Sequence, residues 1–234
     1  MVSIIGIIGT FPIVIVFGIC FVFTLKAYLK KPNISILYFM IYFFSIALIY
    51  FVWALRVLFI PQFESDVRVV YPFWAFIYGM GGLALISLDF ATLDLTYMKE
   101  SNLVKFIKAI IVVSLAGGWI LLIIGFDVEL LVFMDVTDLT VKDPFAYIYM
   151  TIILLSYIFF PNAIFIIYLI KWPSRTVIHK KLRIIELGIL LFSICFTLDA
   201  IKIPSNIGIL IIRILLMISG LIIMKGLLIR PQEK

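Results

Sequence analysis

Residues 2–25, VSIIGIIGTFPIVIVFGICFVFTL, form a stretch of sequence without a single charged side chain. At 1.5 Å per residue, a helix of this length spans about 36 Å, which exceeds the roughly 30 Å hydrocarbon core of a bilayer. A cleaved signal peptide starts with basic residues and has a shorter apolar core, and this stretch has neither feature. It therefore predicts a transmembrane helix as the first element of the fold.

The rest of the chain repeats this pattern. Of its 234 residues 65% are hydrophobic and 14% are charged, and the mean hydropathy is +1.27, whereas soluble domains are roughly 45–50% apolar. Six further apolar segments are long enough to cross a membrane, and they cover residues 34–60, 70–97, 104–126, 146–170, 183–203 and 205–229. We predict an all-α membrane protein, a bundle of seven transmembrane helices that forms one domain over residues 1–234.

The basic residues predict how the bundle is oriented. Fourteen of the 19 Lys and Arg residues fall near the C-terminus, or in or within about five residues of the connections between the first and second, the third and fourth, and the fifth and sixth segments. Because basic residues concentrate on the cytoplasmic side of a membrane, we expect the N-terminus outside and the C-terminus in the cytoplasm of a multi-pass cell-membrane protein. The net charge of +6 then faces anionic lipid headgroups, and nucleic acid is not an expected partner.

Several enzyme classes lack their essential residues in this chain. It has one histidine, His179, and no P-loop, GxSxG or HExxH motif, so haem, zinc, nucleotide and common hydrolase sites are not expected. Cys20 and Cys195 lie at different predicted depths, which makes a disulfide between them improbable on geometry. We therefore expect no enzyme activity, no metal and no cofactor.

Two aspartates interrupt the third apolar segment in residues 86–98, ISLDFATLDLTYM. Asp94 lies within one helical turn of the predicted cytoplasmic edge, where the lysines at 99, 105 and 108 can pair with it. Asp89 lies about 12 Å deep and should be paired, because an isolated charge there costs about 2.5–3.5 kcal/mol. Arg213 of the last segment lies within about 6 Å of the same depth. We therefore predict a salt bridge between Asp89 and Arg213, which either clasps two helices or acts as a switch.

Other polar residues extend this predicted site. Thr92 continues the polar stripe of Asp89, and Asn206 lies seven residues before Arg213 on the same helical face. Asn162 follows Pro161, which cannot donate a backbone hydrogen bond and should kink the fifth segment. The predicted ligand-binding or switch residues, in a pocket between the third, fifth, sixth and seventh segments, are Asp89, Arg213, Asn206, Thr92 and Asn162. The predicted cytoplasmic surface for a partner protein consists of Lys180, Lys181 and Arg183.

The longest loop, residues 127–145, has the sequence DVELLVFMDVTDLTVKDPF. Apolar and polar residues alternate on both sides of Asp135, which is typical of two short paired strands. The loop can therefore pair as a short hairpin that caps the bundle. Its acidic residues either form a solvated loop or act as a lid that collects cations.

Two segments carry a family resemblance. The stretch FVWALRVLF (residues 51–59), with a late tryptophan, is followed by PFWAFIYGMGGLALISLDFATLDLT (residues 72–96), with a tryptophan, a tyrosine and glycines early and a polar end. Together they resemble the seven-helix membrane sensor domains of archaeal and bacterial histidine kinases. The resemblance implies a sensor, although no kinase sequence follows here. Microbial rhodopsins share the predicted topology, but they need a lysine in the middle of the last helix, where this chain has Arg213.

Two classes of function follow. The first is a receptor-like sensor that signals through its basic cytoplasmic loops, with a cytoplasmic signalling protein and a second copy of the chain as the protein partners that this interpretation allows. The second is a small-solute or ion transporter or channel, in which two three-helix units are joined by the fourth helix. A transporter predicts that the first three helices superpose on the last three.

Overall fold

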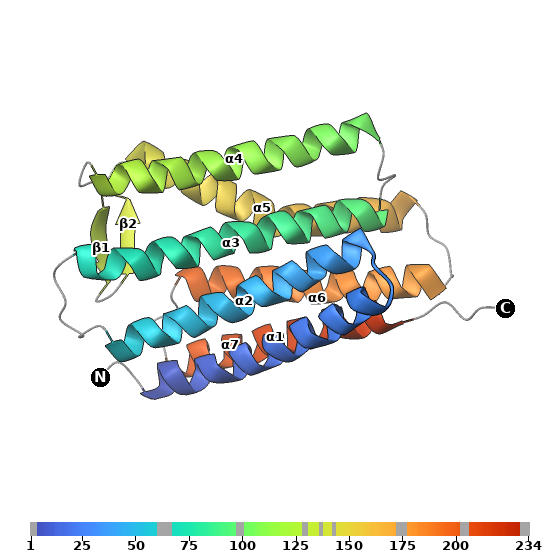
Figure 1. The fold of residues 1–234 in the computed structure, drawn as a ribbon, viewed down its shortest axis with the longest axis horizontal. Helices are drawn as coiled ribbons and strands as arrows, with labels where there is room; N and C mark the ends of the chain where they lie inside the picture. Colours follow the sequence, from blue (N-terminus) through green and yellow to red (C-terminus); the bar gives the residue numbers. More distant parts are fainter. Residues whose placement is uncertain are drawn as a thin grey trace.

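The computed structural model describes residues 4–59, 67–96, 101–127, 131–135, 138–141, 144–171, 177–201 and 206–229. The described residues form seven long helices that run along a common axis (Figure 1). The helices are α1 (Ile4–Lys30), α2 (Ile34–Phe59), α3 (Val67–Thr96), α4 (Asn102–Asp127), α5 (Pro144–Lys171), α6 (Val177–Ile201) and α7 (Asn206–Leu228).

Every predicted apolar segment is a helix in the structure. The largest differences are at two ends, because α1 continues to Lys30 and α6 begins already at Val177. Both extensions carry lysines, so the helices extend beyond the apolar segments that the sequence marks. Apolar composition indicates where lipid covers a helix, and a helix needs only hydrogen bonds between its backbone groups to continue into water.

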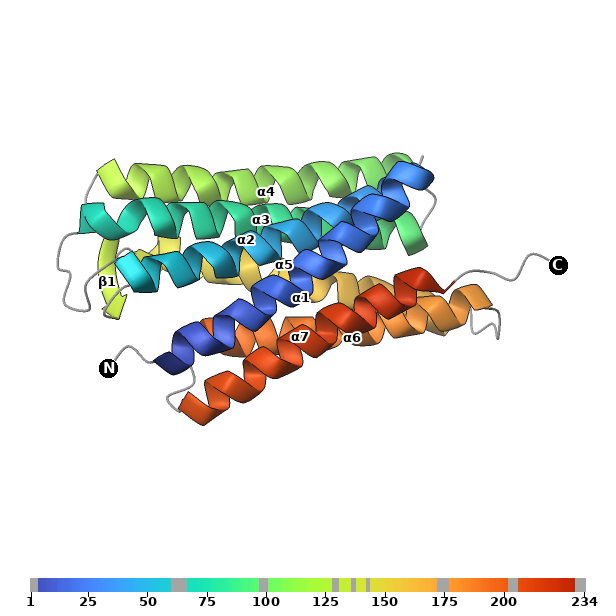
Figure 2. The same ribbon diagram turned by 60° about the horizontal axis from the view of Figure 1, so that its bottom comes forward.

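Six of the seven helices are long and apolar enough to cross a membrane, and the structure fits a multi-pass α-helical membrane protein. The exception among the described helices is α6, which carries Lys180, Lys181, Arg183, Glu186 and Asp199. It nevertheless packs against α5 and α7 within the bundle (Figure 2). The crossing of the membrane by α6 remains a prediction.

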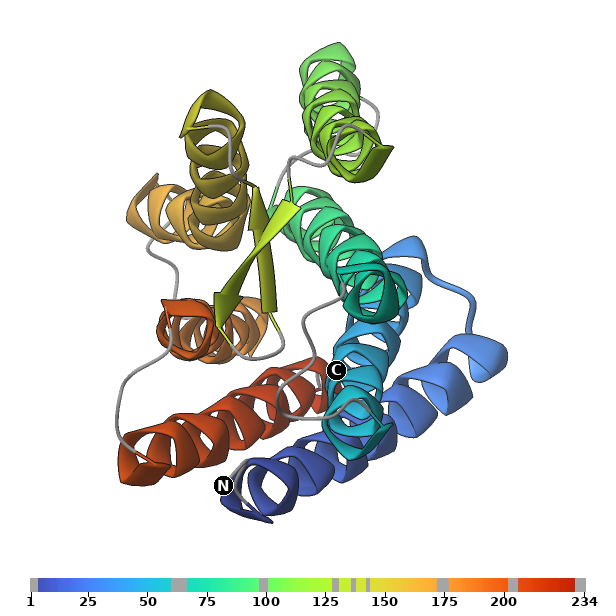
Figure 3. The same cartoon turned by 90° about the vertical axis from the view of Figure 1, so that its left-hand side faces the viewer.

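The helices form a ring of six with one helix outside it. Around the ring α1 packs against α2, α2 against α3, α3 against α5, α5 against α6, α6 against α7, and α7 against α1. The remaining helix, α4, packs on the outside of the ring against α3 and α5, as the view along the bundle shows (Figure 3). In this order α7 packs on α1 and α6 and is not a main neighbour of α3. The predicted pocket between α3, α5, α6 and α7 stays a prediction.

Aromatic side chains fill the centre of the ring. Tyr42 of α2 lies edge-on to Phe192 of α6, with ring centroids 5.2 Å apart, and Phe17 of α1 packs on both Tyr42 and Phe43. All four rings are almost completely buried. The middle helices α2 and α6 therefore meet across the ring through these side chains.

Two glycines allow α6 and α7 to approach closely. A Cβ atom added to Gly188 of α6 would lie 2.8 Å from the backbone nitrogen of Ile223, and one added to Gly226 of α7 would lie 3.1 Å from that of Ile185. Real Cβ atoms essentially never come within 3.0 Å of such an atom, so Gly188 in particular is required by this crossing. The two helices form a closely packed pair.

The predicted hairpin in the longest loop is confirmed. Strands β1 (Leu131–Asp135) and β2 (Asp138–Val141) pair antiparallel, with Leu131 opposite Val141 and a register shift between Phe133 and Asp135. The hairpin lies at one end of the bundle, in contact with α3 and α5 (Figure 3).

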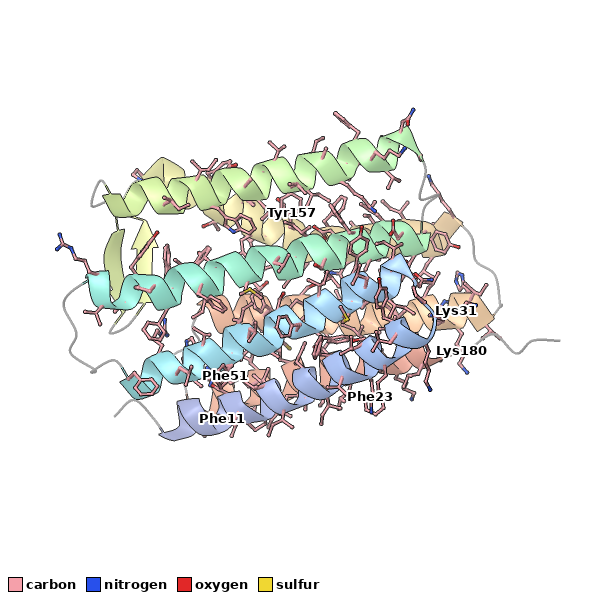
Figure 4. All side chains as sticks on the ribbon, viewed as in Figure 1. Phe11, Phe23, Lys31, Phe51, Tyr157 and Lys180 are labelled. Carbon is pink, nitrogen blue, oxygen red and sulfur yellow. The ribbon has the colours of Figure 1, made fainter. Side chains whose placement is uncertain are left out.

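The basic residues collect at the other end of the bundle. Lys31, which follows α1, and Lys180 near the start of α6 both lie there (Figure 4). Because successive helices run in opposite directions, the described ends that share this side also carry Lys26, Lys30, Lys105, Lys171, Arg183 and Lys225. We call this side the basic end. The charge asymmetry read from the sequence is thus present in the fold, while the assignment of the basic end to the cytoplasm remains a prediction.

Candidate functional site

Arg213 is the centre of a buried polar cluster near the end of the bundle opposite the basic end. Its Nε lies 3.6 Å from Oδ1 of Asp199 in α6, and its Nη1 donates a hydrogen bond of 2.9 Å to Oγ1 of Thr10 in α1. Its guanidinium carbon lies 4.7 Å from the ring centroid of Trp53 in α2. One side chain of α7 therefore contacts α1, α2 and α6.

Tyr50 of α2 completes this set of contacts. Its hydroxyl donates a hydrogen bond of 2.9 Å to Oδ2 of Asp199, so the two carboxylate oxygens face different partners. The guanidinium carbon of Arg56, one turn further along α2, lies 5.4 Å from the centroid of the Trp53 ring, which places Trp53 near two guanidinium groups. We call Thr10, Tyr50, Trp53, Asp199 and Arg213 the Arg213 cluster.

Gly9 explains how α1 approaches this cluster. A Cβ atom at this position would lie 3.2 Å from Cδ and 3.4 Å from Nη1 of Arg213. The absence of a side chain at Gly9 thus leaves room for the guanidinium to reach Thr10, one residue further along α1.

The predicted salt bridge between Asp89 and Arg213 is wrong. Arg213 pairs with Asp199, and neither carboxylate oxygen of Asp89 has a hydrogen-bond partner in the part of the chain that the structure describes. Matched depth is not sufficient for a contact, because α3 packs against α2, α4 and α5 while α7 packs against α1 and α6. A long side chain also leans toward the start of its own helix, which directs Arg213 toward the turn that follows Asp199.

The sequence did contain a signal for the true partner. Asp199 and Arg213 flank the short connection between two consecutive antiparallel helices, an arrangement that brings residues at similar distances from the turn close together. The role of Asp199 as the counter-charge of Arg213 was missed. Tyr50 and Thr10 could not be found in this way, because their helices meet α6 and α7 only in the folded bundle.

Asp94 pairs as predicted. Its Oδ1 lies 2.7 Å from Nζ of Lys108 in α4. The same ammonium group lies 5.2 Å from the ring centroid of Tyr38 and 4.9 Å from that of Phe90. Lys108 thus connects α4 with α2 and α3 close to the basic end.

Asn162 and Ser193 connect α5 with α6. Nδ2 of Asn162 lies 2.8 Å from Oγ of Ser193, and that hydroxyl lies 2.8 Å from the backbone oxygen of Ile158. Nδ2 also reaches the oxygen of Ile158 at 3.4 Å. Asn162 and Ser193 thus both bond the carbonyl of Ile158, one turn before Pro161. The predicted kink at Pro161 stays a prediction.

The remaining predicted site residues lie as follows. Thr92 is buried and donates a hydrogen bond of 2.8 Å to the backbone oxygen of Leu88 in its own helix. The side chain of Asn206 is outside the described residues. At the basic end Lys180 and Arg183 are exposed and Lys181 is half-buried, and burial lowers the pKa of Lys181. Cys20 and Cys195 are buried and free, as expected.

The chain was compared with models of protein families, with curated proteins and with solved structures. None of the three comparisons finds a match.

Proposed function

We propose that this protein is a receptor-like membrane sensor whose Arg213 cluster responds to a ligand and whose basic end contacts a cytoplasmic partner. The observation that supports the proposal is the arrangement around Arg213, where one ion pair and two hydrogen bonds connect α1, α2, α6 and α7. A ligand that competes for Asp199 or Arg213 would change the contacts of four helices at once. Such differential contacts are what a ligand needs in order to shift a conformational equilibrium.

The α6 and α7 pair offers a route from the cluster to the basic end. Both helices contribute to the Arg213 cluster, and Gly188 and Gly226 hold their other halves in close contact. Movement of the pair against α1 and α2 would displace Lys180 and Arg183, which are exposed and form the proposed partner surface together with Lys181. The resemblance to the sensor domains of prokaryotic histidine kinases agrees with this proposal.

The experiment measures distances between spin labels at the basic end. Cysteines replacing Lys31 and Lys180, which lie at the same end of the bundle (Figure 4), report the position of α6 against α1. We expect the distance between these labels to change when Arg213→Gln removes the ion pair. The two native cysteines are buried, which limits background labelling.

A matched pair of labels tests the route. Cysteines replacing Lys180 and Lys225 both lie on the α6 and α7 pair, so their separation should stay the same in Arg213→Gln. An unchanged distance between positions 31 and 180 would show that the cluster does not communicate with the basic end, and the sensor proposal would fail.

A transporter or channel is the second candidate, and the order of the helices favours it. In the ring, α1, α2 and α3 are consecutive neighbours, α5, α6 and α7 are consecutive neighbours, and α4 lies outside. This is the packing order expected of two three-helix units that are joined by one further helix, here α4. In a transporter the centre of the ring must open to each side in turn.

Ser45 of α2 distinguishes the two candidates because its side chain is completely buried. In a transporter, Ser45→Cys would react with a membrane-impermeant thiol reagent added to either side of sealed vesicles. In a sensor it would stay protected from at least one side.

A further inference from the structure

Asp89 of α3 is a buried acid for which the described residues provide no counter-charge. The residue is 0% exposed, and neither Oδ1 nor Oδ2 has a hydrogen-bond partner in the part of the chain that the structure describes. Arg213, the partner predicted from the sequence, pairs with Asp199, and Lys108 of the neighbouring helix α4 pairs with Asp94.

Three more buried oxygen atoms in the same part of the bundle are also without hydrogen-bond partners among the described residues. They are the hydroxyl of Tyr42 and Oγ of Ser45 in α2, and Oδ1 of Asn162 in α5. Both helices pack directly against α3. The carboxylate of Asp89 and these three atoms offer only oxygens.

Contacts between the helices place these oxygens at similar levels along the bundle. The ring of Phe90, the residue after Asp89, packs on Tyr38 with centroids 5.5 Å apart. Tyr42 is four residues and Ser45 seven residues further along α2, which is about 6 Å and about 10 Å along the axis.

The α5 side shows the same agreement. Asp89 lies seven residues before the end of α3 at Thr96, and Asn162 lies nine residues before the end of α5 at Lys171. These positions are about 10 Å and about 14 Å from the ends of two helices that run in the same direction. The oxygens from α2, α3 and α5 thus fall within about two helical turns.

A carboxylate in this position needs a positive charge. Burying an isolated charge costs several kcal/mol, and the energy is recovered only by a counter-charge or by protonation. The described cations on the helices packed against α3 do not supply it. Lys108 of α4 is bonded to Asp94, and Lys105 of α4 and Lys171 of α5 are exposed at the basic end. Arg56 of α2 lies on the Trp53 ring, eighteen residues or about 27 Å along the helix from Tyr38. One positive charge from outside the protein would balance Asp89.

The chemistry of the oxygens limits the class of ligand. Carboxylate, hydroxyl and amide oxygens suit hard cations. A divalent ion would leave an uncompensated charge beside a single carboxylate, and the described residues contain no group of three or more His, Cys, Asp or Glu side chains that could hold a metal ion. We propose that Asp89 is the charged ligand of an internal site for one small monovalent cation, Na⁺ or H⁺, with Ser45 and Asn162 as neutral ligands.

The site is separate from the Arg213 cluster and does not depend on the proposed function. It lies seven residues from the end of α3, about 10 Å along the helix axis from the basic end, and the cation would enter and leave from that side.

The first arm of the test measures thermal unfolding of the full chain in lipid nanodiscs while Na⁺ replaces choline at constant ionic strength. If Na⁺ is the ligand, Na⁺ at about 100 times its Kd should raise the Tm of the wild-type protein by roughly 5–10 °C. Asp89→Asn should remove this response. Asp94→Asn, which changes the acid bonded to Lys108, should keep it.

The second arm tests for the proton by infrared spectroscopy. If H⁺ is the ligand, the wild-type protein should show the C=O stretching band of a protonated carboxylic acid, and Asp89→Asn should lack it. The band should weaken as the pH rises, because the site then loses its proton.

Three results would overturn the proposal. One is a wild-type protein with neither a Na⁺ response nor an acid band. Another is an acid band that neither Na⁺ nor pH changes, which would mean a permanently neutral structural residue. The third is a response that Asp89→Asn retains. If Asp89→Asn does not fold, Na⁺ titration of the wild-type protein together with infrared spectra of aspartate labelled with ¹³C still decides between these outcomes.

Discussion

The ion pair between Arg213 and Asp199 should be visible as coupling in a double-mutant cycle. Arg213→Gln removes the charge that faces Asp199 and the contact with the Trp53 ring. Breaking a fully buried pair by removing one partner costs about 3–5 kcal/mol. The side chain of Asp199 is 17% exposed and keeps the hydrogen bond from Tyr50, so we expect a smaller loss, about 2–3 kcal/mol. For a protein of this size that lowers the Tm by roughly 4–12 °C.

The double mutant sets the size of the coupling. After Arg213→Gln, the second change Asp199→Asn no longer breaks an ion pair. The double mutant should therefore lose about 1–2 kcal/mol less stability than the sum of the losses in the two single mutants. The assay is thermal unfolding in one detergent for the wild-type protein, both single mutants and the double mutant.

A second cycle is the matched control. Asp89→Asn combined with Arg213→Gln should be additive to within about 0.5 kcal/mol, because these residues share no partner and lie on helices that are not main neighbours. Coupling between Asp89 and Arg213, together with additivity between Asp199 and Arg213, would refute the assignment of the partners.

Three further predictions follow from single contacts. Gly188→Ala should cost about 1–3 kcal/mol by overpacking the contact between α6 and α7, measured as a fall in Tm. Lys108→Met should cost about 2 kcal/mol in the same assay, because it leaves the side chain of Asp94, only 2% exposed, without its ion-pair partner. A cysteine replacing Asp135 in β1 should react with impermeant reagent on intact cells, whereas a cysteine replacing Lys180 should not, because the basic end is predicted to face the cytoplasm.

Each of these predictions has its own control. Gly79→Ala should be nearly neutral, since a Cβ atom there meets nothing within 4 Å. Lys105→Met removes an exposed lysine of the same helix and should change the Tm little. Reagent that labels position 180 but not position 135 on intact cells would reverse the predicted orientation.

The sequence by itself determined the membrane class and the number and approximate positions of the helices. Both follow from composition along the chain, because a bilayer requires about 20 consecutive apolar residues wherever a helix crosses it. The pairing of Asp94 was predictable for a similar reason. Its lysine follows the next short connection, and residues on either side of a tight turn meet whatever the rest of the fold does.

Only the tertiary structure decided which helices surround each buried charge. Depth can be counted from the sequence, but neighbours in the bundle depend on how six helices close into a ring and leave α4 outside. That closure brings Thr10 and Tyr50 to the same charged cluster as Asp199 and Arg213, although Thr10 and Arg213 are 203 residues apart in the chain. It also separates Asp89 from Arg213, because α1 and α2 pack between α3 and α7. Packing between distant segments depends on the shapes of all the contacting faces together, and no local pattern in the sequence specifies it.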